Sequence, residues 1–546
     1  MRSDNWTVPD DIIAGPKVKE LYQKVGPAYR WLVIATVMIG SFTTLLTGTI
    51  INVAIPSIMG AFGMSADQVQ WVATGYLAAT TSFMLVTAWA IEAFGLQATY
   101  ITAMVVFLLG SLLGGIAISS EQLILSRLIQ GMAAGLVQPA AMLIIVQVFP
   151  LNRRGMAMGI FSIGVVLAPA MGPTVGGLLV DNLSWRYVFL IQLPLALATI
   201  PLALLFLPTR EATGPRTPFD WLGLILLSLF TAAFLYGLTN GQRFGWSSDK
   251  ITLIFALAAA SGCGFVYWQS HNPTPLMDLS IFKVPAFTAA AIVTFVLGIG
   301  LFGSTYLIPL FLQTVMGVSP TQAGILLMPA GLAMAAMNPV SGFLSDKTSP
   351  RLMIIIGLNV FAFSSFLYSG VDLNTGFFTL IWWTIIGRVG MSCIFPSLNA
   401  AALKALPFQQ MGQGSGVINF LRQLGGAFGV NLLTILLQRR ISFYSDAFMA
   451  SQTASNIATQ DTLASVKETL AQGGVAAAHQ TPIAMQYLAR TINYQASVLS
   501  YRDMFLMIVF IFFLTMIPAW FMGGKQEVQM PPPMPPPKPP PTPPGK

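Results

Sequence analysis

The chain has 546 residues, of which 55% are hydrophobic and 8% are charged, and its formal net charge is +8. Soluble domains carry about 25% charged residues, so this composition excludes a soluble globular protein. Apolar runs of about 20 residues recur along the chain and indicate a protein that crosses a lipid bilayer many times. The positive charge requires no nucleic-acid partner, because cytoplasmic loops of membrane proteins are rich in Lys and Arg.

A polar segment at residues 1–29 has no apolar core of the kind found in cleaved signal peptides, and it contains a short predicted helix at 18–24. Hydropathy then predicts fourteen membrane-spanning helices. They lie near residues 31–55, 69–91, 98–118, 122–148, 156–180, 186–207, 220–240, 250–270, 286–312, 322–343, 351–369, 378–402, 415–438 and 503–522.

The loops on the same side as the N-terminus hold most of the loop Lys and Arg, among them Lys17, Arg153 and Arg210. The positive-inside rule therefore predicts that both termini face the cytoplasm. The long segment 439–502 lies before the last span, and its apolar residues at helical spacing predict one or two helices outside the membrane. The proline-rich tail at 525–546 is expected to be extended or disordered.

The fifth predicted span carries a stripe of small residues. Gly164, Ala168, Gly172 and Gly176 recur every four residues and so share one helix face. Such stripes let two helices approach closely in lipid, although an ordinary tight helix crossing would account for one equally well. Pro169 and Pro173 lie just off the stripe, and each removes a helix hydrogen bond, so the helix is expected to bend.

Similar landmarks occur in the same order in two halves of the chain. The fourth span contains Arg127-Leu-Ile-Gln130-Gly131 and the twelfth contains Arg388-Val-Gly390. The first six spans thus correspond to the last six, with two spans inserted between them. Repeated halves are typical of secondary transporters, which bind substrate at the interface of the repeats.

Taken together, these motifs resemble those of the major facilitator superfamily, and in particular its fourteen-helix drug/proton antiporters of the EmrB and QacA type. Five short segments carry the resemblance. They are the fifth-helix antiporter motif at Gly172, Pro173, Gly176 and Gly177, the loop signature at Gly342, Asp346, Lys347 and Arg351, the fourth-helix motif at Arg127, Gln130 and Gly131, the first-helix signature from Thr49 to Pro56, which includes Asn52, and the sixth-helix segment Ser184-Trp185-Arg186-Tyr187 with Phe189 and Pro194, in which Gln192 takes the place of an Asn.

The resemblance implies an all-α polytopic membrane protein with the major facilitator fold. It divides the chain into an N-terminal cytoplasmic segment, two six-helix bundles, an inserted helix pair and a cytoplasmic tail. The N-terminal segment is residues 1–29, and the two bundles are residues 30–207 and 271–524. The inserted pair is residues 208–270, and the tail is residues 525–546. The second bundle includes the extracytoplasmic loop at 439–502.

The resemblance also implies an exporter of amphipathic compounds in the bacterial inner membrane, driven by proton antiport and able to confer antibiotic resistance. In a Gram-negative source it further implies a periplasmic adaptor and an outer-membrane channel as partners. A dedicated exporter of a metabolite or siderophore has the same fold and motifs, and a non-transporting scaffold or sensor is a third interpretation.

An enzyme is not expected, because the sequence contains no H-E-x-x-H, G-x-S-x-G or Walker pattern. Cys263 and Cys393 lie in apolar runs, and the two histidines, His271 and His479, lie far apart. We therefore expect no metal site, no cofactor and no catalytic residue.

The resemblance implies roles for several side chains. Arg127 and Gln130 would take part in proton exchange or hold the central cavity, whereas a structural Arg bound by backbone carbonyls is the alternative. The loop signature around Asp346 would form a cytoplasmic gate. In the first half, Glu92 takes the place of the Asp and the basic residues are absent, so that gate is expected to be weaker. Arg388 and Arg422 are expected to be structural cations of the second half.

Proton coupling depends on an acid that the family carries in its first helix, and here Thr47 occupies that place. A hydroxyl does not titrate near neutral pH. The remaining acids near the spans, Glu92, Glu121, Asp220 and Asp503, all lie near span ends. Either coupling has moved to an edge carboxylate, with Glu121 as the first candidate, or the protein is not a proton antiporter of the usual kind.

Overall fold

The computed structural model describes residues 16–209, 218–372, 374–453 and 455–523, and the regular structure in these residues is entirely helical. The longer helices are α1 (Pro16–Val25), α2 (Ala28–Phe62), α3 (Ala66–Phe94), α4 (Leu96–Gly115), α5 (Ser120–Val148), α6 (Arg154–Asn182), α8 (Gln192–Phe206), α9 (Trp221–Phe244), α10 (Asp249–His271), α11 (Pro285–Thr314), α12 (Pro320–Lys347), α13 (Pro350–Tyr368), α14 (Phe377–Lys404), α15 (Met411–Ser451), α16 (Ile457–Gln472) and α17 (Ala477–Trp520). The short ones are η1 (Leu151–Arg153), α7 (Tyr187–Leu190), η2 (Leu279–Lys283), η3 (Phe408–Gln410) and η4 (Phe521–Gly523).

Among the described residues, 14 helical segments are long and apolar enough to cross a membrane. This confirms the predicted number of spans and the all-α fold class. The short N-terminal helix is also present, as α1. Several spans are longer than their apolar runs; α2, for example, continues to Phe62 and ends where Gly63 adopts a left-handed conformation with φ of 63°. Glycine adopts this conformation without strain, so it sets the end of the helix.

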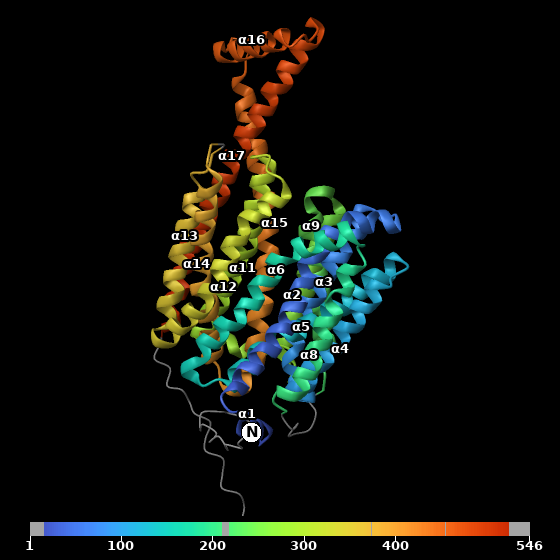
Figure 1. Ribbon diagram of the computed structural model, residues 1–546, viewed down its shortest axis with the longest axis vertical. Coiled ribbons are helices and arrows are strands. Elements are labelled where there is room, and N and C mark those ends of the chain that lie inside the picture. Colours follow the sequence, from blue (N-terminus) through green and yellow to red (C-terminus); the bar gives the residue numbers. More distant parts are fainter. Residues whose placement is uncertain (1–15, 210–217, 373, 454, 524–546) are drawn as a thin grey trace, which may run out of the picture.

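The helices form two groups that lie side by side (Figure 1). In the first group α2 packs on α6 and α3 packs on α5, and in the second group α11 packs on α15 and α13 packs on α14. The two groups meet along two seams, one between α6 and α12 and the other between α3 and α15. Successive spanning helices run in alternate directions, so the start of α6 and the end of α12 lie at the same end of the bundle as α1.

The helix pair α9 and α10 packs beside the seam between α3 and α15. Thr231 of α9 shares a hydrogen bond of 2.7 Å with Ser82 of α3, and Phe234 stacks on Phe428 of α15 with ring centroids 6.4 Å apart. Helix α9 therefore contacts both groups. Its N-cap, Asp220, accepts hydrogen bonds from Gly223 N at 2.8 Å and from Gln269 Nε2 at 2.7 Å, which joins α9 to the end of α10.

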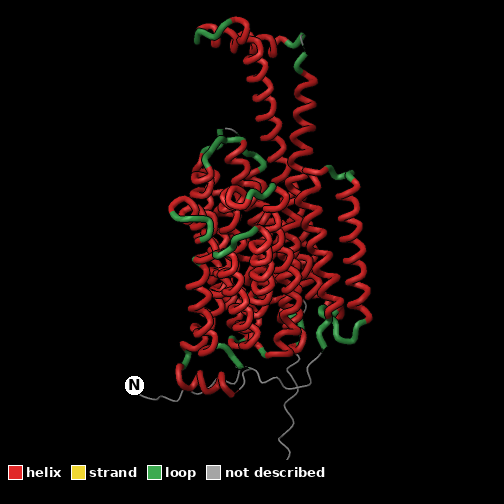
Figure 2. The backbone as a smooth tube through the Cα atoms, turned by 90° about the vertical axis from the view of Figure 1, so that its right-hand side faces the viewer, coloured by secondary structure: helices red, strands yellow, loops and turns green. Residues whose placement is uncertain are grey.

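Helices α15 and α17 project far beyond the other spans, at the end opposite α1, and α16 lies across their tips (Figures 1 and 2). We call this projecting part the hairpin. The segment 439–502 is thus mostly helical, as its spacing predicts. It differs in one respect, because α15 and α17 run from the bundle into the hairpin without a break. The stretch of α15 after Gly429 contains neither Gly nor Pro, the residues that interrupt helices.

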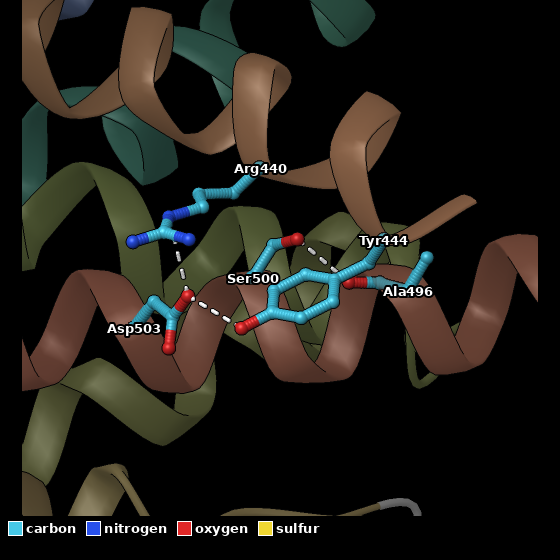
Figure 3. A network of polar contacts seen from close by, with 5 residues as sticks. All are labelled: Arg440, Tyr444, Ala496, Ser500 and Asp503. Carbon is cyan, nitrogen blue, oxygen red and sulfur yellow. Dashed lines mark hydrogen bonds and ion pairs between the residues drawn. The ribbon is translucent and has the colours of Figure 1, made fainter. Parts of the chain in front are cut away.

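At the base of the hairpin, Asp503 of α17 is bound by two side chains of α15 (Figure 3). Tyr444 donates its hydroxyl to Asp503 Oδ2 at 2.9 Å, and Arg440 Nε lies 3.4 Å from the same oxygen. These contacts join the two helices where they leave the bundle. The proline-rich tail at 525–546 lies outside the described residues.

Candidate functional site

Arg127 lies in the third turn of α5 and is 1% exposed. Its guanidinium donates hydrogen bonds to Val72 O of α3 at 2.8 Å and to Thr47 O of α2 at 3.3 Å. A third bond goes to Gln130 Oε1 at 2.8 Å, one turn along α5. Residues three apart on a helix share a face, so the sequence alone indicates the Arg127–Gln130 pair. The carbonyls of α2 and α3 become partners only through tertiary packing.

An aromatic ring covers the same guanidinium. Arg127 Cζ lies 4.2 Å from the centroid of the Tyr76 ring, which is a cation–π distance. Tyr76 is held in place by its hydroxyl, which donates to Thr44 O at 2.6 Å. Gly131 lets α3 approach here, because a Cβ at this position would lie 2.5 Å from Tyr76 O.

Gln130 extends the polar cluster toward α4 and α8. Its Nε2 donates to Ser111 Oγ at 2.8 Å and to Gln192 Oε1 at 3.2 Å, and all three side chains are buried. Ser111 carries no motif and was not indicated by the sequence. The cluster of Arg127, Gln130, Ser111, Gln192 and Tyr76, which we call the Arg127 cluster, therefore joins four helices of the first half.

Acidic groups lie away from this cluster. No carboxylate of the described residues contacts Arg127, and Glu121 is exposed at the start of α5, where Ser120 Oγ donates to it at 2.9 Å. Thr47 is buried, but its hydroxyl donates to Thr43 O of its own helix at 2.8 Å. Asn52 is exposed on α2. Arg127 is thus a buried cation whose hydrogen bonds go to neutral oxygens.

The glycine stripe of α6 faces α2. A Cβ added at Gly176 would lie 2.7 Å from Ile50 O, and one at Gly164 would lie 2.5 Å from Met38 Cγ. A Cβ at Gly172 would overlap Thr49 Oγ1, whereas Gly177 has ordinary space around it. Helix α6 runs through both Pro169 and Pro173 without interruption. The stripe therefore brings two helices of the same half together at backbone distance.

Asp346 connects the two halves at the α1 end of the bundle. The carboxylate, near the end of α12, accepts hydrogen bonds from Gly155 N at 2.7 Å and Met156 N at 2.8 Å, in the first turn of α6. A helix N-terminus attracts negative charge, so this is a favourable pairing. Gly155 and Gly342 have no room for a side chain, because the backbones of α6 and α12 touch there.

The two basic residues of the loop signature contact aromatic rings. Lys347 Nζ lies 4.3 Å from the centroid of the Phe343 ring, and Arg351 Cζ lies 3.5 Å from the centroid of the exposed Trp520 ring. Glu92, the first-half counterpart of Asp346, is exposed near the end of α3.

The two arginines of the second half also have neutral partners. Arg388 is 9% exposed, and its Nη2 donates to Thr305 Oγ1 of α11 at 2.7 Å. Arg422 of α15 donates to Asn419 Oδ1 and, at 3.5 Å, to Asn399 Oδ1 of α14. Within the described residues, no group of three His, Cys, Asp or Glu side chains is placed to hold a metal ion.

Comparison with known proteins agrees with this architecture. The sequence model of the Major Facilitator Superfamily matches residues 37–430. The multidrug export protein EmrB of Haemophilus influenzae is 31% identical over 412 residues, which are 75% of this chain and 81% of that protein. EmrB of Escherichia coli is 28% identical over 495 residues, or 90% of this chain and 95% of that protein. The solved structure of the proton:xylose symporter XylE superposes with a TM-score of 0.56 at 13% identity, covering 89% of this chain and 96% of that one, and so shares the fold. The chain therefore belongs to the Major Facilitator Superfamily, as a fourteen-helix transporter similar to the EmrB multidrug export proteins.

Proposed function

We propose that this protein is a secondary active exporter that moves amphipathic small molecules out of the cytoplasm, as a multidrug efflux permease of the bacterial inner membrane. The Arg127 cluster is the observation that carries the proposal. A charged side chain buried within membrane helices is costly and usually marks a substrate or ion pathway. The relatives named as multidrug export proteins support the substrate class.

The two groups of helices act as the moving halves, residues 30–207 and 271–524, with residues 208–270 as the inserted pair. Rocking of such halves about a central site gives alternating access. The α1 end faces the cytoplasm, in keeping with the Lys and Arg of its loops. In this orientation the contact between Asp346 and the first turn of α6 joins the two halves at the cytoplasmic end and would close it.

Proton antiport is the coupling that the family relationship favours, and Asp346 is the carboxylate best placed for it. Glu121 is exposed and contacts its own helix end. Asp346 instead contacts the other half, so loss of its charge would weaken the contact that closes the cytoplasmic end. In proteoliposomes with an imposed pH gradient, Asp346→Asn should abolish gradient-driven transport, whereas Glu121→Gln should retain it. If Glu121→Gln abolished gradient-driven transport and Asp346→Asn retained it, Glu121 would be the coupling carboxylate.

The hairpin is the surface that we assign to a periplasmic adaptor, through which an outer-membrane channel would be reached. It extends well beyond the bundle (Figure 2) and carries exposed apolar side chains, with Met485 54% and Tyr487 53% exposed. A photo-crosslinking residue at Tyr487 should capture a co-expressed adaptor, and one at the lipid-facing Phe510 should not. Unchanged export from intact cells after removal of α16 would contradict this assignment.

Dye accumulation in cells with and without the protein tests the proposed export. The panel contains an anionic, a neutral and a cationic amphipathic dye. Expression of the wild type should lower the accumulation of at least one dye, and Arg127→Met should abolish the difference. Lys250→Gln, at the exposed start of α10, is the matched control and should export normally. Equal accumulation of every dye with and without the wild type would refute the proposal.

A further inference from the structure

The charges inside the membrane bundle are all of one sign. In the described spans, most charged residues lie near helix ends. Others lie between Arg439 of α15 and Asp503 of α17, which is the hairpin and its base. The charges that remain are three arginines, Arg127, Arg388 and Arg422, and no Asp or Glu lies among them. The interior of the described bundle is therefore cationic.

The three arginines differ in how far their charge is enclosed. Arg127 is 1% exposed, and three of its N–H donors already make hydrogen bonds within the protein. Arg388 is nearly as buried, at 9%. Arg422 is partly exposed, and it donates hydrogen bonds to two side-chain amide oxygens. Its Cζ lies 4.8 Å from the centroid of the Phe395 ring. Neutral oxygens orient a guanidinium through hydrogen bonds but do not neutralise its positive charge.

Arg422 also lies where the two halves meet. One turn earlier on α15, Asn419 Nδ2 lies 3.7 Å from Met142 Sδ of α5, in the other half. Another turn toward the α1 end, Gly416 packs against the backbone of Met84 of α3. The guanidinium of Arg422 is therefore next to the seam between the halves, which is where transporters built from repeats bind substrate.

The chemistry of the Arg422 guanidinium indicates which ligand fits this position. Arg forms bidentate, charge-assisted hydrogen bonds with carboxylate, sulfonate or phosphate groups. A cation entering the seam would meet the field of three arginines with no acidic partner to offset it. The Phe395 ring and the flexible Met142 side chain offer apolar contact to the rest of the molecule.

We propose that the transported compounds are amphipathic organic anions, whose acidic group pairs with Arg422 at the seam between α5, α14 and α15. This inference rests on the proposed export function. It also bears on the energy source, because the cytoplasm is electrically negative and the membrane potential by itself drives an anion outward. Export then requires no carboxylate inside the spans, and any proton exchange at the membrane edge would add to the electrical force.

The test uses the full-length protein in proteoliposomes with a potassium diffusion potential and no pH gradient. Two xanthene dyes of opposite charge are compared, carboxyfluorescein as the anion and tetramethylrhodamine methyl ester as the cation. An inside-negative potential should accelerate protein-dependent efflux of carboxyfluorescein, and an inside-positive potential, which favours exit of a cation, should produce no protein-dependent efflux of the cationic dye. Arg422→Gln should lower the carboxyfluorescein rate at least tenfold.

Two variants separate the role of the charge from a role in folding. Arg422→Lys keeps the charge and should retain more efflux than Arg422→Gln, and Lys250→Gln at the exposed start of α10 should match the wild type. Protein-dependent efflux of the cationic dye, or carboxyfluorescein efflux unaffected by Arg422→Gln, would overturn the anion inference and leave export intact. If neither the cells nor the vesicles move any dye, the export proposal falls and this inference falls with it.

Discussion

Asn338 of α12 is 0% exposed, and neither its Nδ2 nor its Oδ1 has a hydrogen-bond partner among the described residues. Asn338 lies at the seam between α6 and α12, where its backbone packs on Gly159. A buried donor or acceptor left unsatisfied costs about 1–3 kcal/mol, so the two groups of this amide cost about 2–6 kcal/mol in the closed state. Water would satisfy both groups when the seam opens.

Asn338→Leu is the change that removes this cost. Leucine has the same number and branching of side-chain heavy atoms but no polar atoms, so the closed seam should gain at least about 2 kcal/mol relative to the open one. That shift corresponds to a factor of about 30 in the equilibrium between the two states. Exposure of the leucine to water in the open state would add to the shift. We therefore expect the variant to be held closed toward the cytoplasm and to transport slowly.

A reporter thiol at Ser341→Cys, which is 2% exposed in the closed state, measures the opening. The native Cys263 and Cys393 are replaced by Ser, and labelling by a maleimide in membranes is followed with time. Asn338→Leu should slow labelling about 30-fold, in proportion to the open population. Asn359→Leu, on the exposed surface of α13, is the matched control. Equal or faster labelling in Asn338→Leu would refute the reasoning.

Three further changes test other parts of the structure. Gly172→Leu would overlap Thr49 of α2, a clash that costs at least about 1–3 kcal/mol, and should abolish transport in assays where membrane insertion is normal. Thr47→Ala should retain most transport, because Arg127 binds the carbonyl of Thr47 and not its hydroxyl. Burial opposes ionisation of Asp220, but the hydrogen bonds from Gly223, Trp268, Gln269 and Leu276 outweigh it and hold its pKa below the ordinary 3.8. The ionised form therefore stabilises the fold above pH 3.8, and that stabilisation is lost as the pH falls below it; Asp220→Asn should melt earlier in detergent near neutral pH, with the difference shrinking in acid.

Hydropathy predicts the spans well because the bilayer requires about 20 apolar residues for each crossing. It does not predict where the helices end, since α15 and α17 continue into water on polar sequence. That continuation depends on helix-forming residues and on contacts such as Tyr444 with Asp503, which join residues distant in the sequence. The hairpin was therefore predicted as helix but not as an extension of two spans.

In the candidate site, too, the sequence predicts features that depend on helix periodicity but not contacts that depend on tertiary packing. The spacing of Arg127 and Gln130 places them on one helix face, and the glycine stripe of α6 predicts close approach of some helix. The identity of that helix, α2, follows only from the fold. Ser111 could not be found at all, because a single Ser in an apolar run has no pattern and acquires its role from the Gln130 side chain 2.8 Å away.

The altered loop signature of the first half, in which Glu92 replaces the Asp and the basic residues are absent, has a structural counterpart. The seam between α6 and α12 is closed by the Asp346 carboxylate on two backbone N–H groups, a contact that depends on charge. At the seam between α3 and α15, Glu92 is exposed, and the helices meet instead where a Cβ at Gly416 would lie 2.7 Å from Met84 O. Van der Waals packing of this kind does not respond to protonation. A proton or a nearby charge can therefore act on one seam alone, and we infer that opening toward the cytoplasm is controlled at α6 and α12 while the seam of α3 and α15 follows.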